Sequence, residues 1–286
     1  MTKNKNLNTP ITIECNSKLL DLSTPVVMGI LNLTEDSFYD GGQHNSIKKA
    51  LLQTEKMLDD GAKIIDIGAY SSRPKAKHIS LNEEWQRLEK TLQIINKEFP
   101  QAILSTDTFR SEIALRSVDN GADIINDISA GNLDPHMFDT VAALDVPYIM
   151  MHMQGTPQSM QDNPHYDCIE KEVENYFLSK VKTLQQKGLS KIIIDPGFGF
   201  GKTLEHNYQL LNNLEELHTL KLPLLVGISR KSMIYKVLET DAIKALNGTT
   251  AIHSLCLSKG ASILRVHDVK EAVECVKLIN FAKNLL

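Results

Sequence analysis

Carboxylate and amide side chains stand just after short apolar segments of this sequence. Asp107, Asn126 and Asp195 are the clearest cases, and the cations Lys231 and Arg265 occupy similar places further along the chain. Buried carboxylates pair with a ligand that offers several N–H donors, and arginine beside loop backbone binds an anion such as phosphate. A flat heterocycle with an amino-amide edge and a phosphate tail satisfies both requirements. Aminopterins and purine nucleotides both fit this description.

Further candidates share a place at the ends of the same apolar segments. Phe200 could cover one face of a flat ring, and His267, beside Arg265 in the sequence, could help to bind the anion. The remaining candidates at these ends are Asn32, Asp36, Ser72, Arg73, Pro74, Met151 and Ser229.

The glycine-rich stretch 195–203 does not match the known phosphate-binding patterns. The Walker pattern requires glycine five places before Gly201, where Pro196 stands, and the spacing G-x-G-x-x-G is also absent. We interpret the stretch as a tight loop that lets the backbone approach a ligand.

A recurring phrase indicates which elements position these residues. Gly61, Gly121, Gly188 and Gly260 each follow an amphipathic segment and precede a short run rich in Ile, Leu or Val. Glycine ends a helix because it accepts the left-handed conformation. A short continuous apolar run is typical of a strand buried on both faces of a parallel sheet. The phrase therefore predicts a helix, a glycine stop and a buried strand, four times over.

Four further apolar runs, 26–31, 102–105, 148–151 and 224–226, bring the expected strands to eight. Because helical patterns lie between the strands, we predict an α/β fold, a (βα)8 TIM barrel, with an open doubly wound sheet as the alternative. In such a barrel the strands run into their following loops around one pocket mouth, where the candidate residues would meet. Residues 11–22 alternate like a short N-terminal β-hairpin, which would plug the bottom of the barrel.

Size and composition predict a single domain over residues 1–286, with a polar, flexible start at 1–10 that lacks the apolar stretch of a signal peptide. A net charge of −4 gives no general attraction to nucleic acid or to an anionic membrane. No apolar run approaches the roughly 18 residues of a membrane span. The four cysteines lie far apart, which favours a reduced, cytoplasmic protein over a disulfide scaffold.

At this point the residues resemble a known family. The stretches 27–38 (VMGILNLTEDSF) and 66–74 (DIGAYSSRP) closely resemble the first two signatures of dihydropteroate synthases. Other stretches resemble elements of this family in the family's order, and the likeness runs from about Ile13 to the C-terminus. These stretches are 151–157, 195–202, 227–232 and 265–269.

The resemblance implies a βα-barrel that forms a homodimer and works in folate synthesis. The expected substrates are 6-hydroxymethyl-7,8-dihydropterin diphosphate and 4-aminobenzoate, and the products would be 7,8-dihydropteroate and pyrophosphate, with Mg²⁺ assisting. By the same resemblance, Arg265 would stack on the pterin. The pterin would be held by Asp107, Asn126, Asp195 and Lys231.

The resemblance also implies roles around the rest of the substrates. His267 would bind the diphosphate together with Arg265, and Asn32 would contact Mg²⁺. Asp36 and Arg73 would belong to two mobile loops that close over the reactants, and together with Lys231 they are the expected catalytic residues. The aminobenzoate would be framed by Ser72, Arg73, Pro74 and Ser229.

The sequence departs from the family pattern at Glu35, Tyr70 and Lys75, where the family usually has Pro, Glu and Gly. Glu35 and Lys75 add charge to the two loops, which bears on loop closure and on the response to sulfonamides. Two alternatives stay open. A methyltetrahydrofolate:corrinoid methyltransferase would share the Asp/Asn floor without requiring Ser-Ser-Arg-Pro or Ser-Arg-Lys-Ser. A non-catalytic pterin-binding homologue should lack the loop carboxylate and the Arg-x-His pair.

Overall fold

Eight parallel strands form the centre of the molecule. The computed structural model describes residues 12–33, 43–71 and 77–285. Neighbouring strands pair in the order β8-β7-β6-β5-β4-β3-β10-β9, and a bridge between Ile194 and Leu224 joins β8 to β9 and closes the ring. The strands are β3 (Val26–Asn32), β4 (Ile64–Gly68), β5 (Ile103–Asp107), β6 (Ile124–Asp127), β7 (Tyr148–Met151), β8 (Ile192–Asp195), β9 (Leu225–Val226) and β10 (Ile263–Val266). The predicted TIM barrel is therefore confirmed, and the open doubly wound sheet is excluded.

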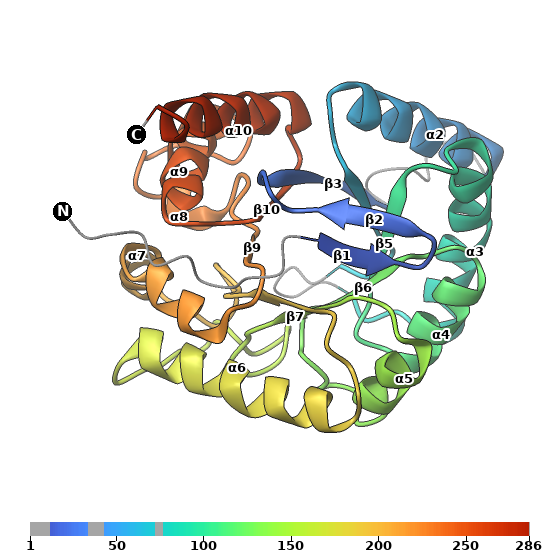
Figure 1. Cartoon of the computed structure of the whole chain (residues 1–286), viewed down its shortest axis with the longest axis horizontal. Coiled ribbons are helices and arrows are strands. Elements are labelled where there is room, and N and C mark those ends of the chain that lie inside the picture. The colour runs from blue at the N-terminus through green and yellow to red at the C-terminus, as the bar shows by residue number, and fades with distance from the viewer. Residues whose placement is uncertain (1–11, 34–42, 72–76, 286) are drawn as a thin grey trace.

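Helices surround this ring on its outside (Figure 1). Each of the four glycines of the recurring phrase ends its helix with a positive φ, of 104° at Gly61 and Gly121, 94° at Gly188 and 89° at Gly260, as predicted. The helices are α2 (Gln43–Asp59), α3 (Leu81–Glu98), α4 (Ser111–Asp119), α5 (Met137–Leu144), α6 (Ile169–Gln186), α7 (Leu204–Asn212), the 3-10 helix η1 (Leu214–Leu220), α8 (Ser232–Tyr235), α9 (Leu246–Ser258) and α10 (Val269–Lys283). No helix within the described ranges is long and apolar enough to cross a membrane.

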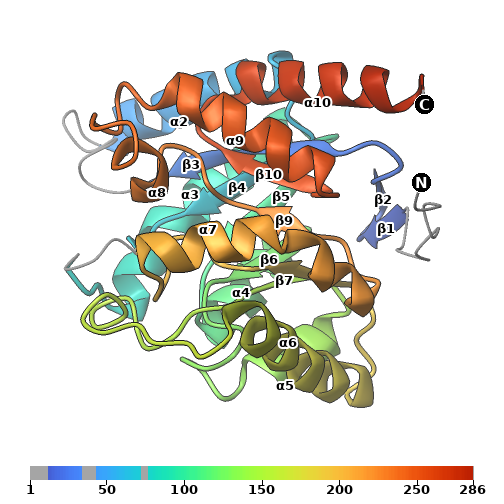
Figure 2. The same ribbon diagram turned by 90° about the vertical axis from the view of Figure 1, so that its left-hand side faces the viewer.

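The predicted N-terminal hairpin is confirmed and consists of β1 (Thr12–Cys15) and β2 (Lys18–Asp21). Ile13, Cys15 and Leu20 pack against the apolar lower interior of the barrel. The Lys18 ammonium donates to the Asp123 carboxylate at 2.7 Å and fixes the hairpin in place. Figure 2 shows the hairpin at the right-hand end of the barrel, opposite α8. The hairpin therefore covers the end of the barrel away from the strand exits.

The barrel interior changes from apolar to polar within two residues along five of the strands, β4, β5, β6, β8 and β10. The lower layer is formed by Ile64, Ile103, Ile124, Ile149, Ile193, Leu225 and Ile263, all of them buried. Side chains alternate across a strand, so the residue two places on also faces inward. Those residues are Asp66, Ser105, Asn126, Met151, Asp195, Gly227 and Arg265. The site described next lies on this second layer and at the strand exits above it.

Candidate active site

Arg265 connects three strands inside the barrel. Its Nε donates to Asp66 Oδ2 at 2.6 Å, and its Nη2 donates to Asp107 Oδ2 at 2.7 Å. The Asn126 amide also donates to Asp66 Oδ2, at 3.1 Å. Gly68, without a side chain, leaves room here, since a Cβ atom at Gly68 would lie 3.3 Å from the Cβ atom of Asp107. Arg265, Asp107 and Asn126, predicted to meet, are thus linked through one cluster.

The charged groups of this cluster shift the pKa values of Asp107 and Arg265. Burial raises the pKa of Asp107 to about 7, and Asp66 adds to that rise while Arg265 opposes it. Burial alone would lower the pKa of Arg265, but the carboxylates of Asp66 and Asp107 outweigh it and raise the pKa above its ordinary value. Arg265 therefore stays cationic, and Asp107 can change its protonation when a ligand arrives.

Asp195 and Lys231 each place a charged atom close to Gly227. A Cβ atom at Gly227 would lie 3.8 Å from Asp195 Oδ2 and 3.9 Å from Lys231 Nζ, so glycine keeps this space open. Asp195 Oδ1 accepts from the Gly197 N–H at 2.8 Å, which leaves Oδ2 toward the space. Burial lowers the pKa of Lys231 to about 8 and raises that of Asp195, and each charge opposes the other's shift. An acceptor and a donor thus flank the same space.

The loop after β8 holds Lys231 in position. Lys231 Nζ donates to the Phe198 carbonyl at 2.6 Å and lies 4.5 Å from the centre of the Phe200 ring. Gly197 has a φ of +68°, and a Cβ atom there would lie 1.9 Å from the His152 carbonyl oxygen. The loop is therefore the tight, closely packed connection that the sequence predicted, with glycine where the backbones meet.

Lys202 stabilises this loop through hydrogen bonds to its backbone carbonyls. The sequence alone did not identify this residue. The residue is 3% exposed, and its Nζ donates to the carbonyls of Gly197 and Phe200 at 2.9 and 3.0 Å. Its third partner is His152 Nδ1, at 2.9 Å. Burial lowers the pKa of Lys202 to about 7 and that of His152 to about 2. His152 is therefore neutral and accepts the bond, as a satisfied core histidine.

Ser229 and His267 meet at the exits of β9 and β10. The Ser229 hydroxyl lies 3.1 Å from His267 Nδ1 and accepts from the His267 backbone N–H at 3.2 Å. Burial of part of the ring and the Arg265 cation lower the pKa of His267 below its ordinary value, although the residue keeps a solvent-exposed side. Arg230, which follows Ser229 in the sequence, forms a two-pronged ion pair with Asp268, which follows His267, at 2.7 and 2.9 Å. Arg230 thus braces the loops of two neighbouring strands.

Apolar side chains form a wall beside the polar groups. Met151, on β7, belongs to a buried cluster with Ile128, Met153 and Met160, and Phe200 packs against it. Methionine and phenylalanine offer the polarizable, flat-sided surface that an aromatic heterocycle prefers. Asn32 ends β3 beside Gly68 of β4 and is half-buried.

Four of the predicted site residues lie outside the described residues. They are Asp36, Ser72, Arg73 and Pro74, and Glu35 and Lys75 lie outside as well. Their expected roles therefore stay predictions.

Comparison with known proteins identifies the family of the chain. The sequence pattern described as "Pterin binding enzyme" matches residues 28–267. The dihydropteroate synthase of Escherichia coli K12 is 45% identical over 262 residues, which cover 91% of this chain and 92% of that protein.

Solved structures give the same result. The dihydropteroate synthase of Yersinia pestis, in complex with a sulfonamide drug, superposes with a TM-score of 0.90 at 41% identity, covering 96% of this chain and 99% of that one. That of Xanthomonas albilineans with 4-aminobenzoic acid gives 0.89 at 36% identity, with the same coverage of both chains. With a buried carboxylate and amide floor, a cationic rim and these relatives, the chain belongs to the pterin-binding enzymes, among the dihydropteroate synthases.

Proposed function

We propose that this chain condenses 6-hydroxymethyl-7,8-dihydropterin diphosphate with 4-aminobenzoate to 7,8-dihydropteroate and pyrophosphate. The observation that carries the proposal is that Asp195 Oδ2 and Lys231 Nζ both lie close to Gly227, in the same barrel interior as the Asp107–Arg265 pair. This arrangement would put acceptors and donors at one edge of a flat ligand and cations toward its tail. The relatives that share this fold support the same reaction, since the Xanthomonas structure contains 4-aminobenzoic acid.

The pterin half of the substrate matches the second layer of the barrel. Asp107, Asn126 and Asp195 would accept hydrogen bonds from the N–H groups of the pterin, and Lys231 would donate to its carbonyl oxygen. Charge-assisted hydrogen bonds of this kind are shorter and about twice as strong as neutral ones. Met151 and Phe200 would cover the ring, and the guanidinium of Arg265 would stack on it. The site would therefore select a ligand that is rich in donors along one edge.

The diphosphate half matches the exits of β9 and β10. Arg265 and His267 would bind the anion. Ser229 would frame the aminobenzoate together with Ser72, Arg73 and Pro74.

The described residues contain no group of three or more His, Cys, Asp or Glu side chains that could hold a metal ion. Mg²⁺ carried by substrate phosphates needs only one or two protein oxygens, and the amide oxygen of Asn32 is of the right type. Bound there, Mg²⁺ would offset the charge of the leaving diphosphate.

In the proposed reaction, diphosphate loss precedes attack by the amine. The C–O bond between the pterin methylene and the diphosphate breaks with both electrons on oxygen, and the reduced pterin delocalises the resulting cation. The aminobenzoate nitrogen then forms the C–N bond and gives up a proton to solvent. The protein would contribute fixed charges and a held nucleophile, and we expect Asp36 to act as the anion near the cation and Arg73 to be a further catalytic residue.

A pyrophosphate-release assay tests this proposal. Release that depends on both pterin diphosphate and 4-aminobenzoate, with dihydropteroate formed in equal amount, would support it. A corrinoid methyltransferase of the same fold would release no pyrophosphate, and a non-catalytic homologue would bind the pterin without turnover. Inhibition by a sulfonamide that 4-aminobenzoate relieves would further support the assignment of the second substrate.

We further propose that the chain works as a cytoplasmic homodimer. Leu278 and Phe281 stand three residues apart on α10 and are 71 and 69% exposed, and Leu285, two residues beyond the helix, is 73% exposed. Leu255 of the neighbouring α9 is 38% exposed. Exposed apolar side chains that gather on one face mark an interaction surface.

The cysteines Cys15, Cys168, Cys256 and Cys275 are all free, which supports a reducing compartment.

A further inference from the structure

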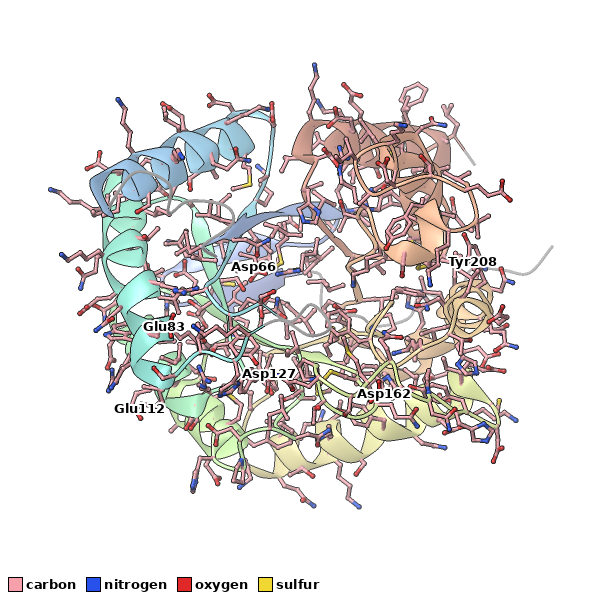
Figure 3. All side chains as sticks on the ribbon, turned by 180° about the vertical axis from the view of Figure 1, so that it is seen from behind. Asp66, Glu83, Glu112, Asp127, Asp162 and Tyr208 are labelled. Atoms are coloured by element: carbon pink, nitrogen blue, oxygen red, sulfur yellow. The ribbon has the colours of Figure 1, made fainter. Side chains whose placement is uncertain are left out.

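Asp66 is a fully buried carboxylate of the barrel interior, and the proposed reaction gives it no task. It lies within β4, between Ile65 and Ile67, and is 0% exposed. Figure 3 labels Asp66 inside the ring of helices. Its Oδ2 accepts from Arg265 and from Asn126, whereas its Oδ1 has no hydrogen-bond partner among the described residues. A fully buried carboxylate with one unused oxygen carries a large desolvation cost.

Stabilisation of the fold does not by itself explain a carboxylate at this buried position. A buried ion pair is often no more stabilising than well-packed apolar side chains of the same size. An apolar side chain can fill the corresponding inward position of a strand, since Met151 does so on β7. The carboxylate of Asp66 therefore has to be explained by what it does to its two partners.

The first partner is Asn126. A carboxylate oxygen only accepts hydrogen bonds, so the Asn126 group that faces Asp66 must be the NH₂. This fixes the amide with its Oδ1 turned away from Asp66. Without Asp66, either end of the amide could face the ligand. The carboxylate thereby decides that Asn126 presents an acceptor to the pocket.

The second partner is Arg265. Asp66 binds Nε while Asp107 binds Nη2, so the planar guanidinium is held along two of its edges. Two carboxylates on one guanidinium fix both its position and the orientation of its plane. Asp107 alone would leave the plane free to rotate about a single contact.

We propose that Asp66 is a positioning residue of the pterin site, which orients the amide of Asn126 and the guanidinium plane of Arg265 without touching the substrate itself. This inference rests on the proposed function, because it takes the pterin as the ligand of those two groups. Asp66 also supplies negative charge beside Asp107. The other charged groups that act on Asp107 are Arg265, Glu84 and Asp127.

The test compares Asp66→Asn with a matched control, Asp123→Asn. Asp123 is also a buried, ion-paired aspartate, 3% exposed and 2.7 Å from Lys18, but it lies beneath the barrel beside the hairpin. Binding of 6-hydroxymethylpterin is measured by calorimetry from pH 5 to 7.5 for the wild type and both variants. Thermal unfolding is recorded alongside. Any ionisation of the ligand itself is common to all three proteins.

We expect Asp66→Asn to weaken pterin binding by about 10-fold to 100-fold, as for loss of a charge-assisted hydrogen bond. Because a like charge near Asp107 is removed, the pH at which affinity changes should fall by about one unit or more. Asp123→Asn should lose stability while its affinity and pH midpoint match those of the wild type. A purely structural role for Asp66 would not move the midpoint.

Asp66→Ser replaces Asp66→Asn in this experiment if Asp66→Asn does not fold. Added formate can then supply the missing carboxylate, and should restore both affinity and midpoint in Asp66→Ser but leave Asp123→Asn unchanged. Unaltered binding in an Asp66 variant, or weaker binding with the wild-type midpoint, would overturn the inference. Failure of the wild type itself to bind the pterin would instead overturn the proposed function.

Discussion

The ammonium of Lys231 lies over the Phe200 ring, 4.5 Å from its centre, although the two residues come from different βα loops. The same ammonium donates to the Phe198 carbonyl. The loop after β8 therefore holds Lys231 with a carbonyl on one side and an aromatic face on the other. Both contacts hold the cation close to Gly227, where Asp195 Oδ2 also lies.

The Phe200 ring should contribute to pterin binding in two ways, by covering the ligand and by its contact with the Lys231 cation. Phe200→Leu removes the aromatic face, which is worth about 0.5–2 kcal/mol to a nearby cation. We expect kcat/KM for the pterin diphosphate to fall by roughly 2-fold to 30-fold, the range to which that energy corresponds. Phe200→Tyr keeps the aromatic face and should stay close to the wild type. Equal losses in the two variants would show that the cation–π contact contributes nothing.

Gly227 should be needed for ligand space and not for folding. A Cβ atom there meets Asp195 and Lys231 only at ordinary contact distance, 3.8 and 3.9 Å. Gly227→Ala should therefore fold normally, with unfolding free energy unchanged or raised by up to about 1 kcal/mol. The methyl group occupies the pterin space, so the pterin dissociation constant should rise about tenfold or more.

Gly197→Ala provides the contrast for this prediction. Its Cβ atom would lie 1.9 Å from the His152 carbonyl oxygen, at a φ that disfavours alanine. This variant should lose more than about 1 kcal/mol of unfolding free energy. Denaturant unfolding and calorimetry on both variants separate the two effects. A Gly227→Ala protein that binds the pterin normally would place the ligand elsewhere.

The sequence was sufficient to predict the barrel, because its signals are local and repeated. Each glycine stop and each apolar run can be read without knowing its neighbours, and the four glycines indeed take positive φ. The site residues that stand at strand exits, such as Asp107 and Asp195, were found for the same reason. A barrel brings all its exits to one mouth, so local positions imply a shared site.

The residues that the sequence reasoning missed sit where that rule does not apply. Asp66 lies inside a strand, and its partner Arg265 is 199 residues away, so their pairing depends on the closed ring. A usable signal was present, since Asp66 follows the inward-facing Ile64 by two residues, as Asn126 follows Ile124. Lys202 looked like the end of a glycine-rich loop. Only packing shows that its charge is buried against carbonyl oxygens.

The exposed face of α9 and α10 should form the dimer interface. Phe281→Glu places a charge in the centre of that face, and burial of an unpaired charge at an interface is unfavourable. We expect sedimentation to show a dimer for the wild type and a monomer for Phe281→Glu. Leu19→Glu is the control, because Leu19 is 65% exposed but lies on the hairpin. A dimer that survives Phe281→Glu, or a monomeric wild type, would contradict this interface.

Diphosphate binding should be coupled to proton uptake at His267. Partial burial and the Arg265 cation hold the pKa of His267 below its ordinary value, so the free protein carries a neutral imidazole near pH 7. An arriving diphosphate adds negative charge beside the ring. An opposite charge favours the protonated form, so the pKa of His267 rises in the complex. Calorimetry in buffers of different ionisation enthalpy gives the number of protons taken up, as the slope of apparent enthalpy against buffer enthalpy.

The comparison of wild type with His267→Asn isolates this proton from others. Protonation of the ligand, of Lys231, whose pKa is about 8, and of Asp107 and Lys202, whose pKa values are about 7, is common to both proteins. At pH 6 to 7 the wild type should therefore take up more protons than His267→Asn on binding the pterin diphosphate. The two should agree on binding the pterin alcohol, which lacks the diphosphate. Equal uptake with both ligands would mean that His267 does not sense the anion, and its place in the diphosphate site would have to be given up.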